Sequence, residues 1–411
     1  MKSIVAFLNQ YLIVLALCFL NSVNSQRNVV DSTSLMFTQS IVKPSLVSSH
    51  PLGIFFSRWE GNFKSNAQKK ISFNMHISSA NIWSPPVVGY FPNNPNDRLY
   101  VSQFPWHARE FKVDVDTLNA KSIEVQNDGV IKGMKVHATI PVSRNSELKI
   151  GIRTFLLTKG KLPFSLLTND EVIEFFHDNI AGGNDPFDRK LYGLNEGKIR
   201  YQDQNNNVLN IEAGNLILSG FEFSYYYYLN NNQAPKNIIY INFGTHAGIN
   251  TSKYNRSVDL GISANLLKVF DIKNQKKINV GLSLGTSRTN VIILKQSNIE
   301  FNNNPFIGYL EAITELTFRT KKPTKHHIGI DFYLQTSLNT KSEFNYLIPT
   351  KNGVSFKSWN SGISNLYKNN NYWTLMYSIE KKITTTFYLQ QDLTVNNNPD
   401  IQTGINVSFG L

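Results

Sequence analysis

Cysteine is almost absent from this chain of 411 residues, which contains only Cys18. That residue falls in an N-terminal stretch where Lys2 precedes an apolar run over residues 11–20 and small residues follow. These features predict a secretory signal peptide over residues 1–25, cleaved near Ser25. The mature chain then has no cysteine, which excludes disulfide bonds and cysteine metal sites.

Long hydrophobic runs are also missing. After the signal peptide, no apolar stretch approaches the roughly 20 residues of a membrane-spanning helix. Yet the chain has 27 Phe, 18 Tyr and 5 Trp at a mean hydropathy of −0.25. Its formal charge of +12 favours anionic lipid or polysaccharide surfaces. Because no basic run is interleaved with aromatic residues, we expect no nucleic-acid partner.

Most of the chain alternates between apolar and polar residues with the period of two that marks β-strands. Examples are the stretches 71–78, 134–140 and 278–285. Such segments run to about 9–12 residues, the length that a tilted strand needs to cross a membrane. A soluble β-sandwich alternates too, but here the polar face is often Gly or Ser, which suits the wall of a lumen.

The connections between these segments alternate in length. Val142–Glu147 and Thr320–Thr324 are short, whereas Thr158–Gly214, Asn290–Pro305 and Asn339–Asn369 are long. Short periplasmic turns and long extracellular loops alternate in this way in outer-membrane barrels. We therefore predict an all-β fold, a transmembrane antiparallel β-barrel of twelve strands, with fourteen as the alternative.

The predicted barrel covers residues 51–411, and its first strand lies near Lys70–Trp83. Residues 26–50 are Ser- and Thr-rich without a sustained period, so we expect a periplasmic leader or a piece inside the barrel mouth. Asn127-Asp128-Gly129 is a good tight-turn sequence, so we expect a turn there.

The chain ends inside an apolar-alternating strand, with Phe409 and Leu411 on its apolar face. Barrel-assembly signals have this form, although they usually end in an aromatic residue. We expect the barrel-assembly machinery and outer-membrane lipid as partners, and the outer membrane of a Gram-negative cell as the location.

One segment has helical rather than strand periodicity. Thr168 and Glu171 have the spacing of a capping box, and Gly182 and Gly183 follow the helix as a stop. The predicted loop helix carries apolar and polar residues on opposite faces: Val172, Ile173, Phe176 and Ile180 against Glu174 and His177. Glu174 and His177 could hold a metal or pass a proton, but a solvated face is the favoured interpretation, with no metal.

The apolar face of this helix is too large to leave in water. We expect the helix to fold inward and constrict the lumen; burial in the outer lipid leaflet is the alternative.

The same region resembles a known family. The sequence EVIEFFHDNIAGGNDPFDRK, within Phe164–Lys190, is similar to a stretch in domain-of-unknown-function family 3187, uncharacterised Gram-negative proteins thought to be outer-membrane barrels. Glu174, Phe176 and His177 match its short acidic segment, and glycines and Arg189 follow. The resemblance covers a small part of the chain. It implies a fold and a compartment, but no activity.

His76, Ser78 and Asn81 raise the question of catalysis, because outer-membrane phospholipases use these residue types for acyl transfer. Here Met75 and Ile77 define the lipid-facing parity, so His76 and Ser78 face the lumen and Asn81 points away from them. We therefore expect a protein that is not an enzyme and has no cofactor.

Charged residues of both signs fall on the lumen-facing parity. Basic residues gather early in the chain and acidic ones late, and they are candidates for a constriction: Lys135, Lys149, Arg153, Glu311, Glu315, Arg319 and Asp331. A transverse field that orients solutes and a salt-bridge network that fills a narrow barrel are both consistent with this pattern.

The favoured function is passage of a small polar or amphiphilic solute through the loop-constricted lumen. The alternative is a non-conducting surface or assembly protein that binds partners through its long loops. A lipid-modifying outer-membrane enzyme is a third, less favoured hypothesis.

Tags inserted near Asn303 and Asn352 should be accessible from outside intact cells, because both positions lie in long loops. Tags near Lys273 and Lys322 should be protected. Labelling of the second pair alone would show that the barrel has the opposite orientation in the membrane.

Overall fold

The computed structural model describes residues 40–44, 50–88, 105–106, 109–110, 124–161, 165, 167–181, 183, 189–203, 205, 207–229, 239–273, 276–320, 324–340, 368–392 and 399–411. The predicted signal peptide, most of the predicted leader and position 352 lie outside these residues. No helix among them is long and apolar enough to cross a membrane.

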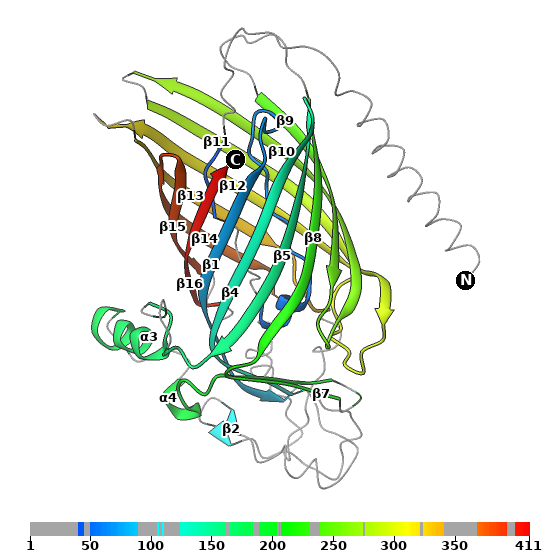
Figure 1. Ribbon diagram of the computed structural model, residues 1–411. Helices are drawn as coiled ribbons and strands as arrows, with labels where there is room; N and C mark the ends of the chain where they lie inside the picture. The colour runs from blue at the N-terminus through cyan, green and yellow to red at the C-terminus, as the bar shows by residue number, and fades with distance from the viewer. Residues whose placement is uncertain are drawn as a thin grey trace, which may run out of the picture.

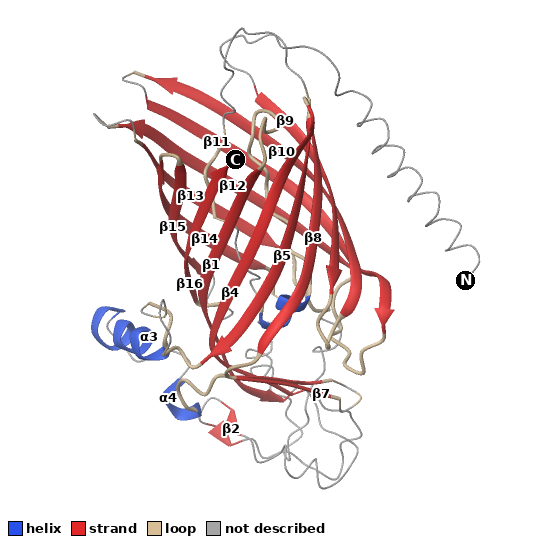
Figure 2. Ribbon diagram, viewed as in Figure 1, coloured by secondary structure: helices blue, strands red, loops and turns tan. Residues whose placement is uncertain are grey.

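A closed antiparallel barrel dominates the described structure (Figures 1 and 2). Its twelve strands are β1 (Ser72–Val88), β4 (Glu124–Ser143), β5 (Ser146–Thr158), β8 (Leu216–Tyr228), β9 (Ile239–Asn250), β10 (Arg256–Ile272), β11 (Lys276–Lys295), β12 (Phe306–Arg319), β13 (Lys325–Gln335), β14 (Asn370–Glu380), β15 (Ile383–Asp392) and β16 (Ile401–Gly410). Strands consecutive in this order are paired, and β1 closes the barrel by pairing with both β16 and β4. The predicted fold and strand count are confirmed.

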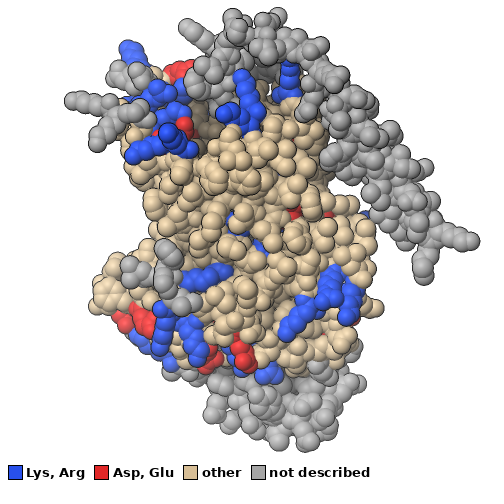
Figure 3. Space-filling view, in the orientation of Figure 1, with Lys and Arg blue, Asp and Glu red and all other residues tan. Residues whose placement is uncertain are grey.

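The alternation of the sequence separates an apolar outer face from a polar lumen. Exposed apolar side chains stand on the outer parity of most strands: Met75, Ile77, Met134, Phe221, Phe243, Leu260, Ile262, Val280, Leu282, Leu284, Ile328, Ile330, Trp373, Leu375, Phe387 and Phe409. Figure 3 shows charged side chains mainly toward the two ends of the barrel on this face. Such an apolar band, closed on itself without a free edge, is the arrangement that a bilayer requires.

The two ends of the barrel differ. Short connections, such as those between β4 and β5 and between β14 and β15, meet at one end with the C-terminus, here called the short-turn end. The opposite, long-loop end carries β6 (Lys198–Gln202), β7 (Val208–Glu212) and the small hairpin of β2 (Pro105–Trp106) and β3 (Arg109–Glu110). The predicted alternation of short and long connections is confirmed for the described residues.

The predicted tight turn at Asn127–Gly129 is wrong, because β4 runs through it. Beyond the barrel proper, Glu124–Asp128 pairs with β6, and β6 pairs with β7. Gly129 has φ of +146° where the strand leaves the barrel wall, a conformation that glycine adopts readily. Gly129 therefore allows β4 to bend at this point.

The predicted loop helix exists as α3 (Asp170–Phe176), continued by the π-helical turn η2 (His177–Ala181). Its N-cap is Asn169, whose side chain accepts a hydrogen bond from Val172 N at 3.0 Å, and not Thr168 as expected. The hydroxyl of Thr168 instead lies 2.5 Å from that of Ser79 on the outer face of β1.

Residues 40–44 and 50–68, here called the luminal segment, precede β1 and lie inside the barrel. The segment includes η1 (Pro51–Phe55), a single 3-10 turn capped by His50. Ser40 and Lys64 form a β-bridge across the expected boundary at residue 50, and residues 40–44 lie in the lumen, in line with the alternative of a piece inside the barrel mouth.

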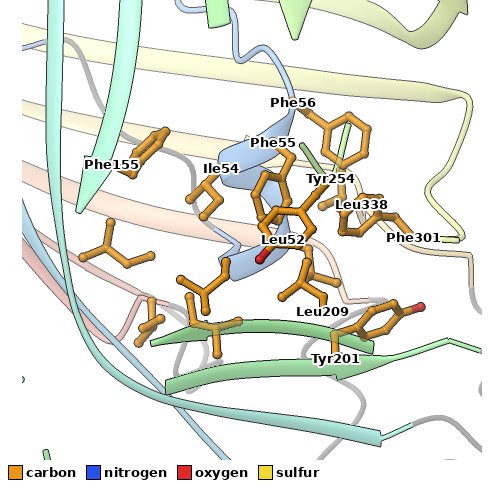
Figure 4. Packing of buried hydrophobic residues seen from close by; sticks show 14 of the residues in the cluster. Leu52, Ile54, Phe55, Phe56, Phe155, Tyr201, Leu209, Tyr254, Phe301 and Leu338 are labelled. Carbon is orange, nitrogen blue, oxygen red and sulfur yellow. The ribbon is translucent and has the colours of Figure 1, made fainter. Parts of the chain in front are cut away.

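The core of the molecule lies where η1 meets the long-loop end (Figure 4). Leu52, Ile54, Phe55 and Phe56 are each at most 2 % exposed. They pack with wall residues and with loop residues around them: Phe155, Leu157, Tyr201, Leu209, Tyr254, Phe301 and Leu338. The hydrophobic core therefore seals one mouth of the barrel.

A closed barrel of this kind should resist detergent until heated, because no strand edge is free to begin unravelling. Purified protein should migrate differently on a gel before and after boiling. Equal migration in both lanes, together with solubility without detergent, would contradict a membrane barrel.

Candidate functional site: the luminal segment and its vestibule

Carboxylates on the barrel wall accept hydrogen bonds from the backbone of the luminal segment. Ser57 N donates to Asp259 at 2.9 Å, Gly61 N to Glu311 at 2.6 Å, and Val42 N to Glu315 at 2.8 Å. The acceptors belong to β10 and β12 and are fully buried. An irregular backbone inside a narrow lumen cannot satisfy its own N–H groups, so the wall supplies the acceptors.

Basic residues on the opposite wall complete this network. Glu222 lies 2.9 Å from Lys135 and 2.9 Å from Arg153, and Lys135 lies 3.7 Å from Glu60 of the luminal segment. Arg153 also donates to the carbonyl of Phe56 at 2.7 Å. Most of the predicted constriction residues therefore hold a piece of the chain itself in place.

Aromatic side chains of the luminal segment fit against glycines of the wall. The ring of Trp59 stacks on His246 with centroids 4.9 Å apart. A Cβ atom on Gly261 would lie 2.4 Å from Trp59 Nε1, and one on Gly281 would lie 2.5 Å from the Phe63 ring. Glycine is therefore required at these lumen-facing positions for close approach of the segment.

Side chains, rather than a β-ladder, connect the segment to the wall. The described backbone-to-backbone hydrogen bonds of the segment stay within it, as from Ile41 N to Phe63 O at 3.0 Å and from Phe56 N to Gly53 O at 3.1 Å. Within the described ranges, the segment could leave the lumen without breaking a barrel strand pair.

A cavity of about 480 Å³ opens at the short-turn end, beside the luminal segment. Its lining includes Lys43 and Lys64 from the segment, and Lys149, Arg319 and Lys325 from the wall. This space is here called the vestibule. Its size is within the range of small-molecule sites, and the apolar core lies at the other end of the lumen.

The predicted constriction residues have unequal roles in the structure. Glu311 pairs with Lys43, and Glu315 faces His327 at 3.4 Å. Asp331 is 1 % exposed on β13. Lys149 and Arg319 line the vestibule.

A piece inside the barrel mouth was an alternative expected for residues 26–50, but residues 51–68 of the luminal segment were not predicted as the partner of these charges. The available signal was the aromatic sequence between Phe55 and Phe63, which lacks strand alternation, preceding a barrel whose lumen face is rich in glycine.

The loop helix does not enter the lumen, so the prediction that it constricts the lumen is wrong. The luminal segment occupies the lumen instead. Phe176 is 46 % and Ile180 is 65 % exposed, and α3 lies beside the barrel near the long-loop end (Figure 1). Val172 is half-buried and Ile173 is buried. The physical reason is that η1 already fills the mouth, and the loop is anchored outside.

Asn81 and Arg189 provide that outer anchor. Asn81 donates to the carbonyl of Thr168 at 3.0 Å and to Asp170 at 2.9 Å. The Arg189 guanidinium is 1 % exposed, donates to Asp400 at 2.6 Å and lies 5.1 Å from the centre of the Trp83 ring. The arginine of the family-like stretch therefore fixes the loop to the outer wall.

The polar face of the helix binds a lysine. Lys190 lies 2.8 Å from Asp178 and 3.2 Å from Glu174, and the hydrogen bonds that it donates to Asp178 and then to Glu174 raise the pKa of Lys190. His177 is the C-cap residue of α3. No group of three His, Cys, Asp or Glu side chains in the described ranges is placed to hold a metal ion.

His76 and Ser78 face the lumen and Asn81 the outer wall, as the parity predicted. His76 Nε2 lies 2.9 Å from the hydroxyl of Tyr388, and the Ser78 hydroxyl points to the carbonyl of Gly133 at 3.4 Å. The three residues therefore have different partners and do not form a nucleophile–base pair here.

No protein-family model and no curated protein matches the sequence. Solved barrels are similar in fold: an outer membrane channel from Pseudomonas putida F1 (8 % identity, 84 % of this chain and 98 % of that chain, TM-score 0.36), the NanC porin (9 %, 68 % and 94 %, 0.35) and the P. putida toluene transporter TodX (7 %, 84 % and 91 %, 0.26). Such low similarity carries no argument about function. The class, a closed twelve-stranded barrel with an occupied lumen, rests on the structure itself.

Replacing Gly261 by Ala should loosen the luminal segment, because the new methyl group would overlap the Trp59 ring. Overpacking of this kind costs about 1–3 kcal/mol. We expect faster tryptic cleavage at Arg58 and Lys64 with unchanged heat-dependent gel migration.

Gly308→Ala is the matched control, since a Cβ there meets nothing closer than 3.7 Å. Equal cleavage rates in the two variants would show that Gly261 does not make room for the segment.

Proposed function

We propose that this protein is an outer-membrane transport barrel, closed at rest by its own luminal segment, which passes a small polar or amphiphilic solute when that segment moves. In this proposal the short-turn end and the vestibule face the periplasm. The observation that carries it is that no described backbone-to-backbone hydrogen bond joins the segment to the wall, so the segment can be displaced while every barrel strand remains paired.

In this proposal, burial and hydrogen bonding of the luminal segment strongly favour the closed state over the open one. Burial of the side chains of Leu52, Ile54, Phe55 and Phe56 contributes roughly 1.5–3 kcal/mol each. Lumen carboxylates add charge-assisted hydrogen bonds to the same segment. A solute or partner can open the barrel only by binding the open state more tightly than the closed one.

A non-conducting surface or assembly protein is the second candidate. The apolar seal at the long-loop end favours it, since Phe55, Phe56 and Phe301 pack against one another at the mouth. The long loops then provide the functional surface, and the luminal segment is a permanent filling. The two functions differ in whether current ever flows.

Planar-bilayer conductance of a tethered variant separates them. A Cβ atom on Gly61 would lie 2.8 Å from Ser283 Cβ, and a disulfide needs about 3.5–4.5 Å, so a small shift permits Gly61→Cys with Ser283→Cys. We expect the reduced protein to show openings and the oxidised protein to show none. The single variant Gly61→Cys should not respond to oxidation.

Glu311→Ala should raise the open fraction, because Gly61 N and Lys43 both lose their acceptor. Glu380→Ala is the matched control, since its carboxylate pairs with Lys325 and His327 of the wall. If wild type, Glu311→Ala and the reduced tethered variant all fail to conduct, the non-conducting alternative holds.

A further inference from the structure

The charges that line the vestibule are unequally paired. Its lining contains the Lys and Arg residues Lys43, Lys64, Lys149, Lys277, Arg319 and Lys325, against the three glutamates Glu60, Glu147 and Glu380. Most cations have a carboxylate of their own: Lys43 with Glu311, Lys64 with Glu147, Lys277 with Asp271 and Lys325 with Glu380.

The lining glutamates are engaged as well. Glu147 also accepts hydrogen bonds from Tyr228 at 2.7 Å and from Gln68 N at 3.0 Å. Glu60 lies 3.7 Å from Lys135, and Glu380 binds His327 at 3.1 Å. These carboxylates therefore have little capacity left for a further cation.

Two of these cations lack a close carboxylate partner, although Glu60 and Glu222 attract Lys149 at longer range. Among the described residues, neither Lys149 nor Arg319 lies within 4.0 Å of a carboxylate oxygen or makes a side-chain hydrogen bond. Lys149 stands on β5 in the lumen and Arg319 ends β12, so they approach the vestibule from well-separated strands. The Nδ1 atom of His137, another lining group, is buried and has no hydrogen-bond partner in the part of the chain that the structure describes.

We propose that the vestibule binds a small polyvalent anion, bearing carboxylate or phosphate groups, between Lys149 and Arg319. The cavity of about 480 Å³ has room for such a molecule. An ammonium acts as a point charge and a guanidinium can bind two oxygens at once, so the pair suits an anion with more than one charged oxygen. His137 can donate or accept a further hydrogen bond, depending on its tautomer.

The proposal deepens the proposed function, because it names the chemical class that the vestibule admits from the periplasm. It does not need an open lumen, since the vestibule exists with the luminal segment in place. Binding and conductance therefore test separate statements.

Isothermal titration of the full-length protein in detergent tests the site, with citrate and inorganic pyrophosphate as probes and sodium chloride added to equal ionic strength. We expect both probes to bind wild type. Lys149→Met should weaken binding about tenfold, which corresponds to about 1.4 kcal/mol. Arg319→Gln should weaken it in the same direction.

Lys268→Met is the matched control. It removes the same charge from the outer face of β10, where Lys268 lies over the Phe270 ring at 5.0 Å, and it should bind like wild type. Loss of binding in this control to the same degree would reveal a general charge effect and overturn the site. Unchanged binding in Lys149→Met, or no binding in wild type, would overturn it as well.

Discussion

The backbone N–H groups of the luminal segment are the constraint on which the rest of the structure depends. In a lumen without regular pairing to the wall, each buried N–H needs an acceptor, and an unsatisfied group costs about 1–3 kcal/mol. Asp259, Glu311 and Glu315 supply acceptors directly. Their charge then requires cations nearby, and Lys43 with Glu311 is one such pair.

Side-chain size on the wall follows from the same constraint. The segment can approach the carboxylates only where the wall carries no side chain. Gly248, Gly261 and Gly281 leave this space next to Ser57, Trp59 and Phe63, respectively. The strands gain nothing from these glycines by themselves, because glycine weakens a strand interior. Wall and segment are thus complementary in shape as well as in charge.

The barrel was predictable because one property, alternation with period two, determines both the strand and the face of each residue. Lumen-facing Lys135 and Glu311 followed from that parity alone. The luminal segment was not predictable in this way, because its contacts join residues far apart in the chain and obey no period. Ser57 and Asp259 are 202 positions apart, and nothing local in either sequence indicates the other.

The sequence correctly predicted that α3 is a helix, but the prediction that it lies in the lumen was wrong. Its periodicity depends on local sequence, whereas its location depends on competition for the mouth of the barrel, which η1 occupies. The sequence carried one indication of where the loop is anchored, because Asn81 interrupts the apolar outer face of β1. A polar residue on a lipid-facing parity indicates that something other than lipid covers it, and here Thr168 and Asp170 do so.

Charge patterns in a lumen do not say whether the countercharge belongs to a solute or to the chain. Lys135 and Lys149 both face inward, yet Lys135 is bound to Glu222, whereas Lys149 makes no salt bridge in the described structure. The distinction arises from the asymmetry of the lumen, which is filled by apolar side chains at the long-loop end and lined by polar and charged ones at the short-turn end. A charged ligand is costly to bury in the first environment and can keep hydrogen-bonding partners in the second. Among the described residues, the environment that suits a charged ligand inside the closed barrel therefore lies at the short-turn end, beside the luminal segment.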